Sequence, residues 1–204
     1  MSKLMMLSAG AAVAAALVAG CGNESADGTA GQGATPTTSS SVAGSQPPAA
    51  AHNDADVMFA QHMIPHHQQA VEMSDVLLAK PDIDAQVRDL ATQIKNAQAP
   101  EIAQMQGWLT QWGNPPMPPM DHGDMAHMQG MVSEADMTAL REAQGVEAAK
   151  LFLTHMIAHH EGAITMAEDE IRDGKDPAAV ELAHTIVSTQ QQEIDSMHQK
   201  LAAL

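Results

Sequence analysis

Two segments of the chain carry imidazole and thioether side chains, which bind soft metal ions as well as packing in a core. The segments, residues 59–73 and 152–166, are called the two motif copies below, and they agree at eight of fifteen positions. The metal ligands that they predict are His62, Met63, His66, His67, Met73, His155, Met156, His159, His160 and Met166. A duplicated pattern of these residue types points to metal binding.

Helical spacing brings several of these residues onto one face. With 3.6 residues per turn, His62, His66 and Met73 fall on one narrow stripe, and the second copy repeats the arrangement. Residues four apart lie about 5–6 Å from each other at Cβ, so two imidazoles can bind one ion. The alternative to metal binding is a structural role, in which a methionine at helical spacing packs in the core. The pattern allows one shared site or two separate sites.

The ligand types favour copper. Thioether and imidazole without thiolate favour copper, above all Cu(I), with silver bound by the same logic, whereas zinc gains little from methionine. A ferritin-type di-iron site needs two Glu-x-x-His elements, and only Glu181 with His184 fits, its counterpart being Asp89 with Thr92. The zincin spacing is also absent after His160. The sequence contains no pattern of a nucleophile with its general base and no cofactor-binding motif. We therefore expect that the protein is not an enzyme.

Apolar periodicity and caps predict the elements that position these residues. Asn53 and Asp54 are good N-caps, and Pro65 and Pro100 predict kinks, or a break at Pro100. The predicted helices span about residues 57–78, 82–112, 133–143, 146–172 and 177–204. No segment alternates with period two, so no strand is expected.

The second helix of each pair repeats as well. Leu90, Ile94, Gln98, Glu101 and Met105 match residues 182, 186, 190, 193 and 197. The unit of duplication is therefore a helical hairpin. We predict an all-α fold, a four-helix bundle built from two duplicated helical hairpins with a short extra helix in the central connection. This domain covers residues 53–204, with hairpins at 53–112 and 133–204.

The connection between the hairpins, residues 113–132, is rich in proline, methionine and histidine. Its secondary candidate ligands are Met117, Met120, His122, Met125, His127 and Met128. Flexible segments of this composition capture copper at lower affinity, and the alternative reading is a plain linker.

The amino terminus predicts export. Residues 1–20 have Lys3 before an apolar run and small residues, as in a signal peptide, and Val18-Ala19-Gly20-Cys21 resembles a lipoprotein lipobox. Cys21, the only cysteine, is the predicted lipidation site. Residues 21–52 predict a flexible Gly/Ser/Thr/Pro/Ala tether. We expect a membrane-anchored lipoprotein facing the periplasm or cell exterior.

The charge balance excludes nucleic acid as a partner. The chain has 9 Lys and Arg against 25 Asp and Glu, for a net charge of −16. Such a surface repels phosphates and attracts cations.

The sequences His-Met-Ile-Pro-His-His at 62–67 and His-Met-Ile-Ala-His-His-Glu at 155–161 resemble the family called domain of unknown function 305. The resemblance covers about residues 54–204. It implies a ferritin-like four-helix bundle in exported bacterial proteins, some associated with copper binding and tolerance. The ligands that it implies are the Met and His positions of the two motif copies.

The sequence as a whole predicts an extracytoplasmic protein that sequesters or delivers copper, with a copper-exporting or copper-receiving protein as a possible partner. One alternative is a helical interaction module in which histidines sense pH without a dedicated metal. Another is a zinc or iron enzyme of unfamiliar geometry. The sequence carries no signature of an oligomeric state.

Overall fold

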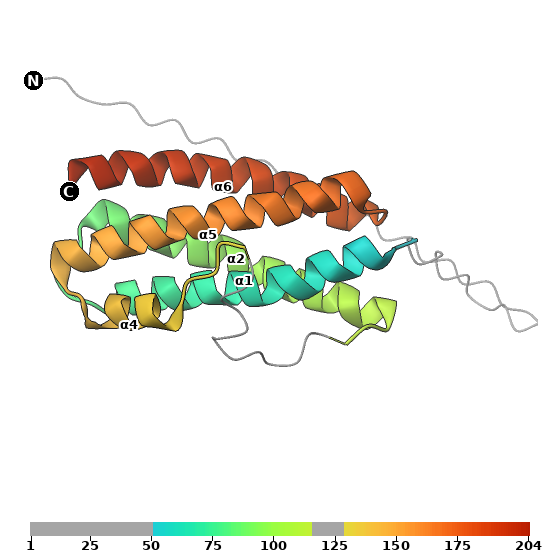
Figure 1. Ribbon diagram of the computed structural model, residues 1–204, viewed down its shortest axis with the longest axis horizontal. Helices are drawn as coiled ribbons and strands as arrows, with labels where there is room; N and C mark the ends of the chain where they lie inside the picture. Colours follow the sequence, from blue (N-terminus) through green and yellow to red (C-terminus); the bar gives the residue numbers. More distant parts are fainter. Residues whose placement is uncertain (1–50, 116–128) are drawn as a thin grey trace, which may run out of the picture. The chain divides into compact units, whose positions relative to one another are not determined.

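This computed structural model describes residues 51–115 and 129–204. These residues form five α-helices joined by short connections, and they contain no strand (Figure 1). The helices are α1 (Asp54–Leu78), α2 (Ala85–Trp112), α4 (Glu134–Glu142), α5 (Gly145–Asp173) and α6 (Pro177–Ala203). The all-helical prediction is confirmed. The predicted signal segment, Cys21, most of the tether and the central loop candidates lie outside the described residues. No described helix is both long and apolar enough to cross a membrane.

The helix ends follow from local capping. Asn53 Oδ1 accepts hydrogen bonds from the backbone N–H groups of Ala55 and Asp56, and the Asn53 N–H donates to Asp56, which completes a capping box. Gly113 ends α2 in the left-handed region, at φ 74°, where glycine has no steric penalty. These short-range contacts explain why the helix boundaries are readable from the sequence to within a few residues.

Both internal prolines lie within uninterrupted helices. α1 continues through Pro65 and α2 continues through Pro100, so the predicted alternative of a break at Pro100 is wrong. An internal proline costs about 3 kcal/mol or more, because it removes one hydrogen bond and its ring crowds the preceding turn. Buried apolar residues on both sides, such as Ile94 and Met105 of α2, offset that cost.

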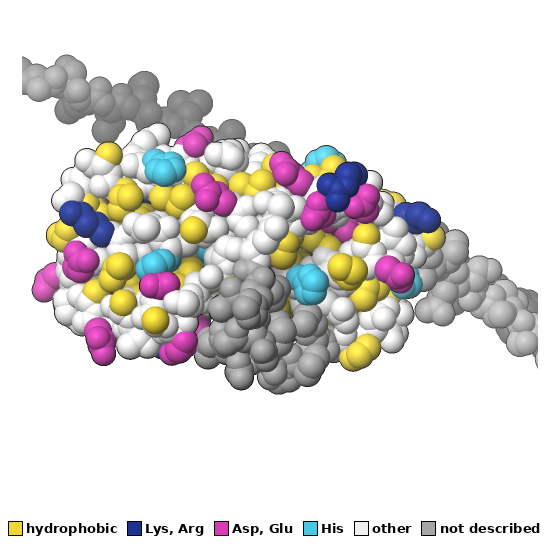
Figure 2. Space-filling model, in the orientation of Figure 1, with side chains coloured by type: hydrophobic (Ala, Val, Ile, Leu, Met, Phe, Trp, Pro, Cys, Tyr) yellow, Lys and Arg dark blue, Asp and Glu magenta, His cyan; other side chains and the backbone are white. Residues whose placement is uncertain are grey.

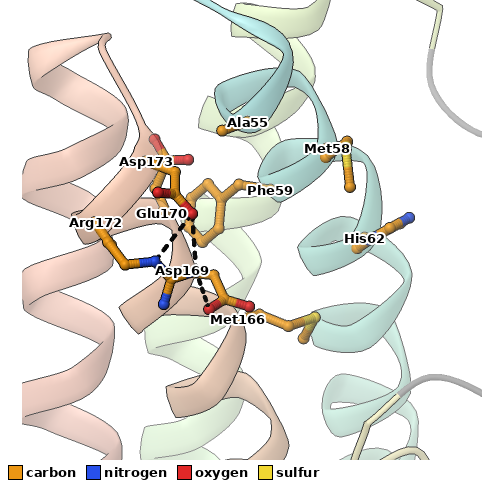
Figure 3. A pocket seen from close by; sticks show the side chains of 9 residues that line it. All are labelled: Ala55, Met58, Phe59, His62, Met166, Asp169, Glu170, Arg172 and Asp173. Carbon is orange, nitrogen blue, oxygen red and sulfur yellow. Dashed lines mark hydrogen bonds and ion pairs between the residues drawn. The ribbon is translucent and has the colours of Figure 1, made fainter.

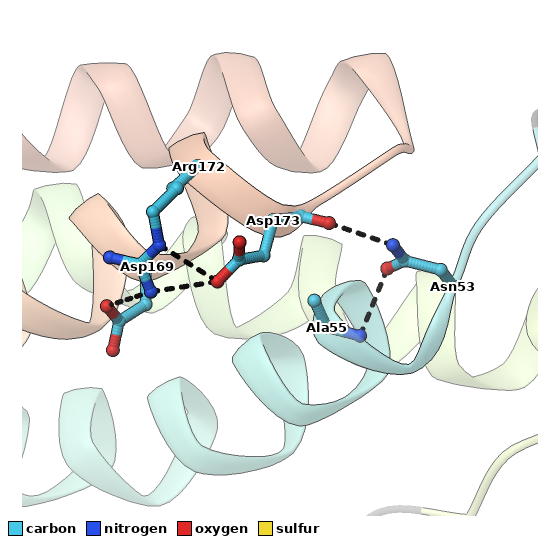
Figure 4. A network of polar contacts seen from close by, with 5 residues as sticks. All are labelled: Asn53, Ala55, Asp169, Arg172 and Asp173. Atoms are coloured by element: carbon cyan, nitrogen blue, oxygen red, sulfur yellow. Dashed lines mark hydrogen bonds and ion pairs between the residues drawn. The ribbon is translucent and has the colours of Figure 1, made fainter.

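The two hairpins meet mainly through α1 and α5. α1 packs along α2 and α5 along α6, while α1 and α5 join the two pairs in antiparallel orientation. Asn53 Nδ2 donates to the Asp173 carbonyl oxygen at 2.8 Å, which ties the start of α1 to the end of α5 (Figure 4). The buried Asp56 side chain accepts the N–H groups of Lys175 and Asp176 at the same place. The two motif copies, one on each of these helices, therefore face each other.

A polar layer divides the hydrophobic core into two clusters. One cluster contains Met73, Leu77 and Phe152, and the other contains Phe59 and Met63. Between them every long helix contributes polar side chains. This central polar layer consists of His66, His67, Gln98, Glu101, His159, His160, Gln190 and Glu193.

The short helix α4 covers only one end of the bundle. Its Met137 and Leu140 are fully buried in the cluster that contains Met73, and α4 packs against both α1 and α5. Lys80 Nζ donates to the carbonyl oxygens of Arg141 and Ala143, at 2.7 Å each, and so holds the end of α4. The other end of the α1–α5 interface has no such cover among the described residues.

The surface is acidic, as the composition predicts. Figure 2 shows Asp and Glu side chains spread over the visible face, with few Lys and Arg between them.

Candidate metal site

Two histidines, one from each motif copy, meet at the centre of the bundle. The ring centroids of His66 and His159 lie 3.7 Å apart with the planes tilted by 39°, and both residues are fully buried. His66 Nε2 lies 3.1 Å from the carbonyl oxygen of Gln129, where the central connection returns to the bundle. The two motif copies thus contact each other through these imidazoles.

Burial keeps these two imidazoles neutral. Burial, followed by the neighbouring His67, lowers the pKa of His66 to about 3. Burial, followed by His66, lowers the pKa of His159 well below its usual value. A neutral imidazole carries one free lone pair, which can accept a hydrogen bond or bind a metal ion.

The other two histidines of the layer are paired with carboxylates. His67 Nε2 lies 2.7 Å from Glu101 Oε2, and His160 Nε2 lies 2.7 Å from Glu193 Oε2. A carboxylate oxygen accepts hydrogen bonds, so Nε2 carries the hydrogen in both pairs. Each pair joins the first helix of a hairpin to the second, and duplication relates the two pairs.

Several polar atoms in the central polar layer, and one imidazole nitrogen outside it, have no hydrogen-bond partner within the described residues. The imidazole nitrogens of this kind are His66 Nδ1, His67 Nδ1, His155 Nε2, both nitrogens of His159, and His160 Nδ1. However, no three His, Cys, Asp or Glu side chains in residues 51–115 and 129–204 are placed so that they can hold one ion. A metal site among the described residues therefore needs ligands of another kind as well, such as thioether sulfur or amide oxygen.

An open pocket at the uncovered end of the α1–α5 interface supplies such ligands (Figure 3). Its volume is about 300 Å³. Met58 and His62 of α1, one helical turn apart, line it together with Met166 of α5. Figure 3 shows Met166 reaching from α5 toward α1. Two thioethers and one imidazole thus lie along one solvent-facing pocket.

Acidic side chains form another part of the pocket. Asp169 and Asp173 pair with the exposed Arg172, with N–O distances of 2.7 and 2.8 Å (Figure 4). Glu170 is only 1% exposed, and neither of its carboxyl oxygens has a hydrogen bond of normal geometry among the described residues. Burial, and then the Asp56 carboxyl, raise the pKa of Glu170 to about 8. At neutral pH Glu170 therefore carries a proton.

The pKa of Asp56 is shifted in the opposite direction to that of Glu170. Burial alone raises its pKa, but hydrogen bonds from the backbone N–H groups of Asn53, Asp176 and Lys175, together with Glu170, lower it below the usual value. An ionised Asp56 therefore lies beside a protonated Glu170.

The remaining predicted ligands are less accessible. Met63, Met73 and Met156 are fully buried in the core, and His155 is half-buried. In the duplicated sequence His155 and Met73 correspond to His62 and Met166. Met73 lies in the cluster that α4 covers, so Met73 is enclosed whereas its duplicate Met166 lines a pocket.

The predicted loop ligands Met117, Met120, His122, Met125, His127 and Met128 lie outside the described residues. The described residues on either side of them contact α1. Gln61 Nε2 donates to the Pro115 carbonyl oxygen at 2.9 Å, and the Gln129 carbonyl oxygen contacts His66. Both contacts lie within about one turn of His62 on α1.

Sequence reasoning did not assign several polar and thioether residues of these regions. Met58 lies outside the repeated segment, although its spacing of four residues from His62 was a usable signal. Gln98, Glu101, Gln190 and Glu193 were visible as a repeat, but served only to show the duplication. Their polarity on an otherwise apolar stripe was the sign of an interior layer.

Comparison with known proteins places the chain among helical relatives. The family model described as "Domain of unknown function (DUF305)" matches residues 56–201. The chain is similar to a solved DUF305 fragment from Deinococcus radiodurans, with 36% identity, a TM-score of 0.69, and coverage of 77% of this chain and 100% of that one. It is also similar to a DUF305 protein from Streptomyces coelicolor that is thought to be secreted, with 35% identity, a TM-score of 0.67, and coverage of 73% and 93%.

A third similar structure is CopM in its Cu(I)-bound form, with 30% identity, a TM-score of 0.61, and coverage of 72% of this chain and 96% of that one. CopM is also known in Cu(II)-bound and Ag-bound forms, which are 28% and 29–30% identical to this chain. No curated protein matches the chain by sequence.

Proposed function

The chain belongs to the DUF305 family, and we propose that it binds copper outside the cytoplasm, to sequester the ion or to pass it on. The observation that carries this proposal is the pocket in which His62 and Met166, from different motif copies, lie with Met58. Thioether and imidazole ligands without thiolate suit Cu(I) and Ag(I) better than harder cations.

The comparison with CopM supports the proposal. That protein is known with Cu(I), Cu(II) and Ag bound, and it shares about three tenths of its residues with this chain over most of its length. The acidic surface also favours cations at the pocket mouth. Copper is therefore the first choice of metal, with silver bound by the same ligands and zinc the weaker competitor.

The buried motif residues are proposed as interior ligands, reached after the pocket. His66, His67, His159 and His160 lie in the central polar layer, and Met63, Met73 and Met156 lie in the core beside it. Because they are fully buried, an ion reaches them only when side chains of the bundle move. His155 is half-buried and is proposed as a further ligand.

The four long helices are proposed to form a ferritin-like four-helix bundle. Two hairpins of similar length, related by duplication and joined through α1 and α5, support this arrangement. Such bundles build metal sites from side chains that face one another across the interior.

Export and anchoring are proposed from the amino terminus. The lipobox-like residues 18–21 support lipidation at Cys21, and one relative is thought to be secreted. In the bacterial host, Cys21→Ser is expected to release the protein from the membrane fraction. The measurement is mass spectrometry of the mature amino terminus together with fractionation, and a Cys21→Ser protein that stays in the membrane fraction contradicts anchoring.

A competition titration tests copper binding. The mature protein is titrated with Cu(I) against a chromophoric chelator under reducing conditions. The triple variant Met58→Leu, His62→Asn, Met166→Leu is expected to weaken binding by about 100-fold or more. His198→Asn, an exposed histidine of α6, is the control and is expected to leave binding unchanged. Wild-type affinity weaker than about micromolar, or an unaffected triple variant, rules the proposal out.

A further inference from the structure

The central polar layer has a second side, between α2 and α6, that the proposed copper pocket does not use. Gln98 and Glu101 of α2 lie one turn apart, and Gln190 and Glu193 of α6 repeat the same spacing. All four line one small cavity of about 10 Å³, together with Ala97, Ile186 and Thr189. A space of this size holds one water molecule or one ion.

The two glutamines of this cavity have buried amide atoms without a hydrogen-bond partner among the described residues. Gln98 is 2% exposed and Gln190 is 3% exposed. Both amide atoms of Gln98 and the Oε1 atom of Gln190 have no hydrogen bond within the described residues. Buried amide groups are rarely left unpaired in folded proteins, so these atoms indicate a ligand between them.

The glutamates of the cavity are held in place from their inner side. Nε2 of His67 contacts Glu101 and Nε2 of His160 contacts Glu193, at 2.7 Å each. In the described part of the chain, imidazole is the only basic group paired with either carboxylate. Hydrogen bonding from the histidines fixes how the carboxylates point, as outer-shell residues do in metal sites.

We propose that this cavity binds one small divalent cation through the carboxylate oxygens of Glu101 and Glu193 and the amide oxygens of Gln98 and Gln190. A donor set made of carboxylate and amide oxygens suits an oxygen-seeking ion such as Mn²⁺, Mg²⁺ or Ca²⁺. Only two of the four donors are carboxylates, which agrees with the lack of any three-member His, Cys, Asp or Glu group in the described ranges.

A groove at the surface adjoins the cavity. It has a volume of about 440 Å³ between α2 and α6, and it shares Ala97 and Glu101 with the inner cavity. Pro100 and the exposed Glu181 also line it. The site differs from the copper pocket in helices, in donor atoms and in preferred ion, so loss of copper binding at the pocket leaves it unaffected.

Binding of Mn²⁺ to the full mature chain tests the proposal. Free Mn²⁺ is followed by electron paramagnetic resonance, and one saturable site per chain is expected. Glu101→Gln with Glu193→Gln is expected to weaken it at least about tenfold. Glu181→Gln removes a carboxylate from the outer groove only, and is expected to leave Mn²⁺ binding unchanged.

A second double variant provides a test if the protein with both glutamate substitutions does not fold. Gln98→Leu with Gln190→Leu removes two donor oxygens and the unpaired amides. It is expected to raise the melting temperature without metal and to abolish the further rise that Mn²⁺ produces in the wild type. No saturable Mn²⁺ site in the wild type, or a site that survives both double variants, overturns the proposal. A stabilised leucine variant beside a wild type that ignores Mn²⁺ also overturns it, and assigns the cavity to water.

Discussion

At the scale of single residues, burial divides the predicted ligands into two groups. His62 and Met166 reach an open pocket, whereas His66, His159 and Met73 are fully buried. Chemical type is the same in both groups, so accessibility rather than composition decides which residue meets an incoming ion first.

The duplication offers a matched test of that division. Met166→Leu is expected to weaken Cu(I) binding at least about tenfold, because it removes a thioether from the pocket. Its duplicate, Met73→Leu, conserves volume in the closed core and is expected to change the affinity for the first Cu(I) equivalent, which the pocket takes, by less than about threefold. Chelator competition on both variants measures the difference. Equal effects, or a larger effect at Met73, contradict the pocket as the entry site.

Glu170 predicts a specific pH dependence of stability. Its pKa is about 8 in the folded protein, against 4.5 as the ordinary value. The folded state therefore binds more protons than the unfolded state between about pH 4.5 and 8, so the contribution of Glu170 is complete below that range and is lost as pH rises through it. Glu170→Gln is expected to flatten this fall and to be more stable than wild type at pH 8 by about 1–3 kcal/mol.

The free energy of unfolding of the wild type and of Glu170→Gln is measured with urea at several pH values. The pH values run from about 5 to about 9, which spans most of the interval between the two pKa values of Glu170. Glu168→Gln, an exposed glutamate of the same helix, is the control and should keep the wild-type slope. A wild-type slope retained in Glu170→Gln shows that another group titrates there.

At the scale of elements, the end of the central connection, at Gln129 and Gly130, crosses α5 at Gly162 beside the buried histidines. Gly130 and Gly162 allow this crossing, since a Cβ on Gly162 lies 2.3 Å from the Gln129 carbonyl oxygen. The same segment brings the Gln129 carbonyl to His66 and the Val132 backbone to the side chain of Gln69. Backbone contact of this kind leaves no room for a side chain.

Gly162→Ala is therefore expected to destabilise the protein by about 1–3 kcal/mol, because the added methyl group meets backbone atoms that do not bend away easily. Gly107→Ala on α2 is the matched control, since its Cβ meets nothing within 4 Å. There the higher helix propensity of alanine is expected to stabilise by up to about 1 kcal/mol. Chemical denaturation measures both, and a stabilised Gly162→Ala contradicts the close crossing.

At the scale of the whole molecule, the two duplicated hairpins differ in how their ends are covered. Both hairpins contribute a histidine–glutamate pair to the central polar layer, but α4 covers one end of the α1–α5 interface, and no described helix covers the other. The two halves thus keep the same interior and differ in what reaches solvent. An open end and a closed end suit a protein that accepts an ion at one place.

Metal binding is expected to stabilise the whole domain by linkage. At a free concentration of 100 times the dissociation constant, a ligand adds about 2.7 kcal/mol. For a domain of this size the melting temperature rises by roughly 5–10 °C. We expect this rise with Ag(I), and a smaller one with Zn(II). Calorimetry measures both, and a zinc shift equal to or larger than the silver shift contradicts a thioether site.

The sequence by itself determined the helices, the duplication and the chemistry of the motif. Caps at Asn53 and Gly113 act within a few residues, and apolar periodicity acts within a turn, so local spacing is enough to read them. The sequence also predicted that imidazoles and thioethers lie together, since both are written into each motif copy.

Only the tertiary structure decided which of these residues meet. Helical spacing puts His62, His66 and Met73 on one stripe, yet His62 shares its pocket with Met166 of another helix, and the ring of His66 contacts that of His159. The sequence shows the polar residues of α2 and α6 as a repeat, but it does not show that they meet in the central polar layer. Helix crossings are set by burial of surfaces far apart in the chain, and the local pattern carries no information about that register.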